Sequence, residues 1–376
     1  MTLSTERTRL QPEAVRALVE DPGPWASVYV GLADRDPQGR PVERAVRWHG
    51  LARTLLDGGA PADVVASIGA AVQAEPPGAA VLAAFAREGR AASLFRVPFL
   101  DEPDTASVGP LPRVLPLLGW LQDHPSHVVV VTDRTGADLE AVAVGGRSRR
   151  WSVAGPDDEI ERNAPGGWAQ GRYQHRAEDS WAHNAAAVAE AVATAVRASD
   201  TRLVIAAGDV RAVQLLEEHL PDGLRKQIAW RKVAGGRSPD GSQRTRPERV
   251  QEAVREFMDG EVGALLGRFA QERAPGGVGV EGVPETFASL ARGEVAALLL
   301  VPDAMCDRSA WFGLHPGRVL PDDRALPPAD WGPAMRAPLA DVAVRAALGT
   351  RGQVWLVPDG LPGSPADGIG AFCRFR

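Results

Sequence analysis

The stretch HVVVVTDRTGADLEAVAV, residues 127–144, decides the fold class of this 376-residue chain. Its first six residues form a run rich in β-branched side chains, which is typical of a strand buried on both faces. The following Asp133-Arg134-Thr135-Gly136 supplies a turn, and residues 138–144 return as a second strand. The stretch therefore predicts a β-hairpin at the start of an α/β domain.

The chain after the hairpin continues this domain. Strand and helix patterns alternate, which indicates a layered α/β arrangement, and Gly208-Asp209 is expected to cap a helix. A polar, glycine-rich stretch, residues 232–246, lacks periodicity and predicts a mobile loop. The other expected elements are a helix at 173–198, a strand at 203–207, a helix at 210–219 and a helix at 247–271.

Both ends of the chain also alternate between strand and helix patterns. The sequence predicts an α/β protein of three mixed α/β domains. These are an N-terminal α/β domain at 1–122, a middle domain at 123–277 and a C-terminal three-layer α/β domain at 278–376. The expected elements at the two ends are strands at 25–32, 91–97, 295–301, 352–357 and 368–375, and helices at 42–56, 62–73, 283–292 and 338–348.

The composition excludes several classes of protein. Hydrophobic residues make up 44% and charged residues 24% of the chain, which is ordinary for a globular protein. No uninterrupted apolar run approaches 18 residues, and the N-terminus lacks a signal-peptide pattern, so we expect a cytoplasmic protein without membrane contact. Cys306 and Cys373 are the two cysteines, too few for a disulfide framework or a thiolate metal site. Without a Walker loop or an HExxH pattern, no cofactor and no metal is expected.

The distribution of charge points to local basic patches. The net charge is −6, which argues against a protein that binds nucleic acid over its whole surface. Residues 225–249 contrast with the rest, because eight cations face only Asp240 and Glu248. Such a segment can follow a phosphate backbone, or it can be a solvated loop that keeps the protein soluble. The cations are Arg225, Lys226, Arg231, Lys232, Arg237, Arg244, Arg246 and Arg249.

The most unusual segment is NAPGGWAQGRYQHR, residues 163–176. Gly166 and Gly167 follow a proline and permit close approach of the backbone to another molecule. Trp168 comes next, and a basic, aromatic helix start follows. Cations there oppose the helix dipole, which a protein tolerates best where an anionic partner binds. Two interpretations stay open: a tip that inserts into RNA, or a turn whose Trp168 folds back onto the core.

Three stretches of the sequence resemble one known family. The GGWAQGRY stretch at 166–173 looks like the GGQ loop of the archaeo-eukaryotic class-one peptide release factor and Pelota superfamily. Residues 203–219 resemble the strand and helix of its middle domain, and residues 287–295, 354–357 and 368–372 resemble its third domain. The likeness is to the bacterial branch, which includes the ribosome hibernation factor Balon and its actinobacterial relatives, and it covers most of residues 125–376.

This resemblance implies a function in translation. A member of this branch is expected to bind the ribosome, occupy the aminoacyl-tRNA site and hold the ribosome inactive in dormancy or stress, with elongation factor Tu as a possible companion. The family places glutamine directly after the two glycines, whereas this chain has Trp168, so peptidyl-tRNA hydrolysis is not expected. The implied RNA-binding residues are Gly166, Gly167, Trp168, Gln170, Arg172, Tyr173 and Arg176, together with the eight cations of 225–249.

Two alternative functions remain at this point. Gln170, two residues after Trp168, is the candidate catalytic residue of a peptidyl-tRNA hydrolase or ribosome rescue factor. Asp133 and Asp138, which flank the turn of the hairpin, are the candidate carboxylates of a metal-dependent nucleic-acid-processing protein.

Overall fold

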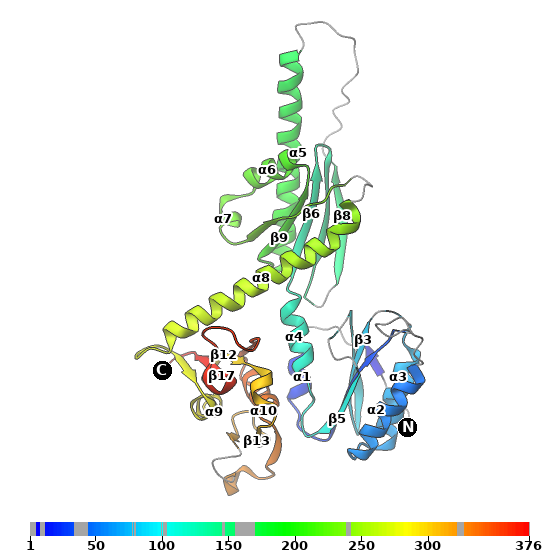
Figure 1. The fold of residues 1–376 in the computed structure, drawn as a ribbon, viewed down its shortest axis with the longest axis vertical. Helices are drawn as coiled ribbons and strands as arrows, with labels where there is room; N and C mark the ends of the chain where they lie inside the picture. The colour runs from blue at the N-terminus through cyan, green and yellow to red at the C-terminus, as the bar shows by residue number, and fades with distance from the viewer. Residues whose placement is uncertain are drawn as a thin grey trace. The chain divides into compact units, whose positions relative to one another are not determined.

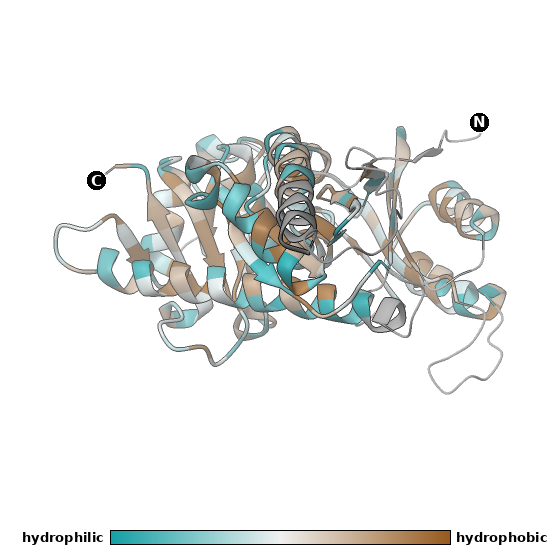
Figure 2. Ribbon diagram, turned by 90° about the horizontal axis from the view of Figure 1, so that it is seen from above, coloured by the Kyte–Doolittle hydropathy of each residue, from teal (hydrophilic) through white to brown (hydrophobic). Residues whose placement is uncertain are grey.

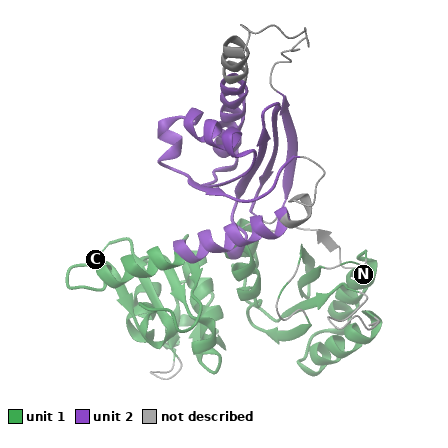
Figure 3. Ribbon diagram, turned by 45° about the horizontal axis from the view of Figure 1, so that its top comes forward, with its two compact units in different colours: residues 1–122, 262–376 green, residues 123–261 purple. Residues whose placement is uncertain are grey.

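The computed structural model describes residues 5–7, 12–33, 44–76, 78, 80–98, 100, 104–144, 147–154, 170–237, 242–321 and 327–375. The side chains of residues 5–7, 170–180 and 242–245 lie outside the described part. The protein is mixed α/β, as predicted. It divides into two compact units, residues 123–261 and residues 1–122 together with 262–376 (Figure 3). The division into three domains stays a prediction.

The middle unit is built on one five-stranded sheet with the strand order β10-β9-β6-β7-β8 (Figure 1). β6 and β7 form the antiparallel hairpin that the sequence predicted, and β6 also pairs with β9 in parallel. β8 and β10 are the two edge strands. The bounds are β6 His127–Asp133, β7 Gly136–Val142, β8 Ser148–Ala154, β9 Leu203–Gly208 and β10 Ala229–Lys232.

Helices cover both faces of this sheet. The long helix α5 and the helix α6 bury their apolar sides on one face, where Val188 and Val192 meet Val128 and Val130. On the other face, Val250 of α8 packs near Val129, Val131 and Ala207. Figure 2 shows apolar residues concentrated on the strands, with polar residues on outward helix faces. The bounds are α5 Gln170–Ser199, α6 Val210–His219, α7 Asp222–Arg225 and α8 Ser242–Glu272.

The predicted cap at Gly208-Asp209 is confirmed, and the geometry explains both residues. Gly208 has φ +129°, and a Cβ there would lie 1.8 Å from the carbonyl oxygen of Thr132, so no other residue fits. The Asp209 carboxylate accepts hydrogen bonds from the main-chain N–H groups of Arg211 (2.9 Å) and Ala212 (3.1 Å). Asp209 therefore satisfies two of the unpaired donors at the start of α6.

The middle unit differs from the sequence predictions at a loop boundary and at an edge strand. The loop expected at 232–246 is too long, because α8 begins at Ser242 and not at Pro247. Glutamine and arginine favour helices, and the cost of Pro247 is mainly one missing hydrogen bond in the second turn. Strand β8, at Ser148–Ala154, was not predicted at all.

The first 122 residues of the other unit carry a five-stranded sheet in the order β1-β4-β3-β2-β5. α2 and α3 pack on one face of it, where Leu55 and Ile68 are fully buried beside Val28. The strand bounds are β1 Thr5–Arg7, β2 Trp25–Gly31, β3 Val81–Arg87, β4 Arg90–Val97 and β5 Thr105–Gly109. The helix bounds are α1 Pro12–Val19, α2 Arg44–Asp57, α3 Ala62–Ala74 and α4 Leu115–Asp123.

The last part of the same unit has a four-stranded sheet, β11-β17-β12-β16, and a small three-stranded sheet, β14-β13-β15. Phe269, near the end of α8, packs edge-on against Phe372 of β17 at a centroid distance of 5.4 Å. The strand bounds are β11 Gly279–Glu281, β12 Val295–Leu300, β13 Ser309–Phe312, β14 Val319–Pro321, β15 Met335–Pro338, β16 Gln353–Leu356 and β17 Ile369–Cys373. The helices are α9 Val283–Ala291 and α10 Leu339–Gly349.

One side chain joins the two parts of this unit. The Gln122 amide donates to the main-chain oxygen of Leu356 (2.7 Å) and accepts from its N–H (2.9 Å). Gln122 therefore pairs with the edge strand β16 as a neighbouring strand does. Among the described helices, none combines the length and apolar character that crossing a membrane requires.

Candidate nucleic-acid interface

The predicted glycine segment lies between two well-placed elements of the middle unit. β8 ends at Ala154 and α5 begins at Gln170. Gly166, Gly167 and Trp168 lie between these ends, outside the described residues. The other predicted residues of this group fall in the first two turns of α5, where side chains are outside the described part: Gln170, Arg172, Tyr173 and Arg176.

Helix α5, which follows that segment in the sequence, is tied to the sheet. The helix has 30 residues, which corresponds to about 45 Å at 1.5 Å per residue. Asn184 donates from its amide to the main-chain oxygen of Arg134 at 2.8 Å, so the helix is tied to the turn between β6 and β7. Trp181 lies under the guanidinium of Arg211, 5.4 Å from ring centroid to carbon. The segment therefore leads into a helix whose position is set by the sheet.

Arg237, one of the predicted RNA-binding cations, is bound to two carboxylates. Its guanidinium donates to Asp133 at 3.0 Å and to Asp138 at 3.1 and 3.2 Å, and it also contacts Thr135 at 3.3 Å. Ser152 of β8 donates to Asp138 at 2.8 Å. Arg237 thus holds the β6–β7 hairpin together.

These bonds also set the ionisation of the two aspartates. Partial burial alone would raise the pKa of Asp133, but hydrogen bonds from Thr135 and the charge and hydrogen bond of Arg237 outweigh it and lower the pKa. For Asp138, partial burial is likewise outweighed by hydrogen bonds from Arg237 and Ser152, so its pKa is also lowered. Both groups are carboxylates at neutral pH and already have a cationic partner.

This geometry gives no support to a metal-dependent reaction at Asp133 and Asp138. A divalent ion there would have to displace the Arg237 guanidinium. In the described part of the chain, no group of three or more His, Cys, Asp or Glu residues is arranged to hold a metal.

Most other cations of 225–249 that the structure describes also have partners. Lys232 lies 2.5 Å from Glu217, Arg249 lies 2.9 Å from Glu252, and Arg225 pairs with Asp222. Arg246 donates to the main-chain oxygen of Gly236 at 3.2 Å. The cations also belong to different elements, because residues 229–232 form β10 and residues from 242 onward belong to α8. The side chain of Arg244 is outside the described part.

Sequence reasoning missed a second group of cations, on the edge strand β8. Arg149 and Arg150 lie in β8 and Arg147 directly precedes it; all three are exposed. The Arg149 guanidinium lies 5.7 Å from the ring centroid of Trp151, and Arg150 pairs with Glu140 at 2.9 Å. The GGRSRRW run at 145–151 was the available signal, since it holds three arginines and no acid.

The position of β8 makes this group suitable for contact with RNA. As an edge strand, β8 has β7 on one side and no strand on the other among the described residues. Successive side chains alternate between faces, so Arg149 and Arg150 flank the free edge on opposite sides. β8 ends at Ala154, and residues 155–169 follow it in the sequence.

The middle unit matches one known protein family. Residues 126–275 match the family described as Bacterial archaeo-eukaryotic release factor family 2. The match spans the five strands of the middle sheet and confirms the resemblance to the bacterial branch of the release factor and Pelota superfamily. The middle unit is therefore release-factor-like.

Two curated relatives come from Mycobacterium tuberculosis: uncharacterized protein Rv2629 of strain ATCC 25618 / H37Rv and uncharacterized protein MT2704 of strain CDC 1551 / Oshkosh. Each is 26% identical to this chain over 393 residues, which covers 97% of both sequences. The likeness therefore extends beyond the middle unit to nearly the whole chain.

Similar solved structures include two archaeal proteins. One is described as a model of ribosome-bound archaeal Pelota and ABCE1, with 14% identity, 100% of this chain and 99% of that chain covered, and a TM-score of 0.40. The other is the archaeal translation termination factor aRF1, with 17% identity, 99% of both chains covered and a TM-score of 0.26. These TM-scores are too low for a residue-by-residue correspondence.

Proposed function

We propose that this protein is a ribosome-binding factor that occupies the aminoacyl-tRNA site and holds the ribosome inactive in dormancy or stress. The proposal is carried by the match of residues 126–275 to the family described as Bacterial archaeo-eukaryotic release factor family 2, combined with Trp168 at the position where the resemblance to the release factor and Pelota superfamily implies a glutamine. An indole ring can stack on a nucleobase, but it cannot position a hydrolytic water as an amide does. Ribosomal RNA is the expected partner, and elongation factor Tu is a possible second one.

The arrangement of the middle unit supports binding to RNA. In the sequence, the glycine segment stands between β8, which carries exposed arginines, and α5, which is tied to the hairpin. A basic strand and a helix start at the two ends of one segment can hold it on a phosphate backbone while its tip enters a narrow space. Cations of 225–249 remain a second proposed contact.

Binding to ribosomes is tested directly by sedimentation. Lysates of growing and starved cells are separated on sucrose gradients, and the protein is followed by immunoblot. The expected result is co-migration with ribosomes that increases on starvation. A protein that stays at the top of the gradient under both conditions, and does not pellet with purified ribosomes, contradicts the proposed function.

The role of Trp168 is tested by Trp168→Ala. Loss of one base-stacking contact is expected to lower ribosome affinity by roughly 5- to 150-fold with an almost unchanged melting temperature. A tryptophan folded onto the core behaves in the opposite way, because its truncation costs about 3–5 kcal/mol of stability. One melting curve and one binding titration therefore separate the two interpretations of the glycine segment.

The competing function is hydrolysis of peptidyl-tRNA through Gln170. Its support is the position of Gln170 as the first residue of α5, where the helix dipole is positive. Purified protein added to ribosomes that carry labelled peptidyl-tRNA is expected to release little peptide. Peptide release that Gln170→Ala abolishes and Trp168→Ala preserves shows that the protein is a hydrolase.

A further inference from the structure

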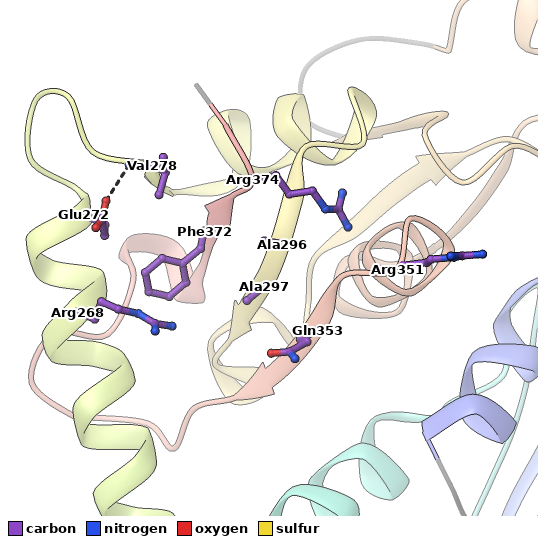
Figure 4. Close-up of a pocket in the computed structure, with 9 residues that line it drawn as sticks. All are labelled: Arg268, Glu272, Val278, Ala296, Ala297, Arg351, Gln353, Phe372 and Arg374. Carbon is purple, nitrogen blue, oxygen red and sulfur yellow. Dashed lines mark hydrogen bonds between the residues drawn. The ribbon is translucent and has the colours of Figure 1, made fainter. Parts of the chain in front are cut away.

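An open groove of about 520 Å³ lies at one end of the C-terminal sheet, beside the last turns of α8 (Figure 4). Its charged lining residues are Arg268, Arg351, Arg374 and the single acid Glu272. The Glu272 carboxylate accepts a hydrogen bond from the main-chain N–H of Val278 at 3.1 Å and is thereby turned toward the backbone. The groove is therefore a cationic site. It belongs to the unit formed by residues 1–122 and 262–376, whereas the predicted basic segment 225–249 belongs to the middle unit.

Arg351 has a backbone conformation that arginine rarely adopts. Its φ is +61°, in the left-handed region that favours glycine. The residue follows the last turn of α10, where its N–H bonds to the Leu348 oxygen (3.1 Å) and the N–H of Gly352 bonds to the Ala347 oxygen (2.7 Å). Glycine is the usual residue at this position of such a helix end. Unfavourable backbone conformations of this kind occur preferentially at binding sites, and the exposed Arg351 lies at the end of the groove away from Arg268, with its side chain pointing outward (Figure 4).

The other two guanidinium groups are held in place. Arg374 donates to the main-chain oxygens of Gly293 (2.7 Å) and Thr350 (2.6 Å), which ties the end of the chain to the turn that presents Arg351. Arg268 reaches from α8 to lie 4.7 Å from the ring centroid of Phe372. Because these two side chains are already ordered, binding of an anion costs less conformational entropy than it would if the side chains were free.

The main chain around the groove leaves little for a peptide to bind. β12 is paired on both sides, with β16 and with β17. Gln122 occupies both main-chain groups of Leu356 on the outer edge of β16. Binding of a peptide as an additional strand is therefore restricted, and the positive charge of the groove is its main attraction for a ligand. Guanidinium groups bind phosphate oxygens through paired hydrogen bonds and without reading sequence.

We propose that this groove binds the phosphates of a single-stranded RNA segment, with Arg268 and Arg351 as the contacts and Arg374 as the residue that positions the turn. The choice of RNA over another phosphate source rests on the proposed function. Neutral lining by Gln353 and Phe372 is compatible with a sugar or base beside the phosphates.

The test is a fluorescence titration of the full chain with a short labelled single-stranded RNA at several salt concentrations. The double variant Arg268→Ala, Arg351→Gly is expected to weaken binding about 10-fold and to flatten the log–log salt dependence by about 1.4, since each single-strand phosphate contact contributes about 0.7. Arg255→Ala is the matched control, because Arg255 is an exposed arginine on the same helix α8, in its part within the middle unit. The control is expected to bind as the wild type does.

Arg351→Gly alone separates binding from folding. Glycine prefers the left-handed conformation at this position, so the melting temperature is expected to stay the same or rise while RNA binding weakens. Weaker binding therefore cannot be attributed to a damaged fold. Unchanged affinity and salt dependence in the single and double variants overturn the proposal.

Two further measurements distinguish a failure of the groove proposal from a failure of the proposed function. A labelled polyglutamate peptide that binds the wild type, loses affinity in the variants and outcompetes RNA shows that the groove takes an acidic protein, and the RNA proposal is wrong. Pelleting with purified ribosomes is measured in parallel. A wild type that fails to pellet contradicts the proposed function, whereas the oligonucleotide titration still decides the groove.

Discussion

The segment 225–249 and the edge strand β8 are both basic, yet their cations are used differently. In the first, Arg237 bridges Asp133 and Asp138, and Lys232 pairs with Glu217. In β8, Arg150 has one exposed ion pair. Arg147 and Arg149 are exposed, and the run 145–151 that contains them has no acidic residue. We therefore expect availability to RNA to depend first on how the fold pairs the cations, and only then on their number.

Of the two basic regions, β8 is expected to contribute more to RNA binding. Replacing Arg147 and Arg149 by Ala is expected to weaken ribosome binding by roughly 10- to 100-fold at low salt and to reduce the salt slope by about two, one for each lost phosphate contact. The matched control, Arg225→Ala with Arg249→Ala, removes the same charge from ion-paired positions. Equal losses in both double variants would show that overall charge, and not the edge strand, determines binding.

The Arg237 bridge is expected to affect stability and not RNA binding. Arg237→Ala leaves two partly buried carboxylates beside each other, and we expect a loss of about 1–2 kcal/mol in the free energy of unfolding after allowance for their solvent exposure. Chemical denaturation measures the loss, and ribosome pelleting is expected to be unchanged. A large loss of binding with an intact fold would return Arg237 to the set of RNA contacts.

The same bridge has a defined pH dependence. Because the pKa values of Asp133 and Asp138 are lowered in the folded state, their contribution is present above the unfolded value of about 3.9 and disappears as pH falls through the lower folded values. The stability difference between wild type and Arg237→Ala is therefore expected to be constant near neutral pH and to shrink below about pH 4. A difference that persists in acid argues that Arg237 acts through packing.

A small effect on ribosome binding is expected from other cations of 225–249. Replacing Arg231, Lys232, Arg244 and Arg246 by Ala is expected to lower ribosome affinity by roughly 2- to 5-fold, because Lys232 and Arg246 already have partners within the protein, and a phosphate contact gains little when it must replace them. Titration at two salt concentrations measures it. A reduction of the salt slope by about four would show that all four residues contact phosphate and that this segment is the main RNA site.

The sequence predicted those parts of the fold that depend on local signals. The hairpin at 127–144, the long helix α5 and the cap at Asp209 follow from β-branched runs, helical periodicity and capping chemistry within a few residues. Strand β8 was missed, because its SRRWSVA pattern becomes a strand only through pairing with β7. Its basic character was visible, but its exposure on a sheet edge was not.

The candidate sites show the same limit. Arg237 and Asp133 are 104 residues apart in sequence, so no spacing rule could place them in contact. The groove of Figure 4 likewise joins residues from α8, β16 and β17. The left-handed conformation of Arg351 is invisible in the sequence, because arginine rarely adopts it.

The two hydrogen bonds between Gln122 and Leu356 have a consequence for the order in which the chain folds during synthesis. The two residues are 234 positions apart, so this contact can form only after nearly the entire chain has left the ribosome. The sheets of the first 122 residues and of the middle unit are each built from one continuous stretch and can form as they emerge, whereas the contact between α4 and β16 must wait for the last part of the chain. Pulse-labelled nascent chains are therefore expected to become protease-resistant last around α4 and β16.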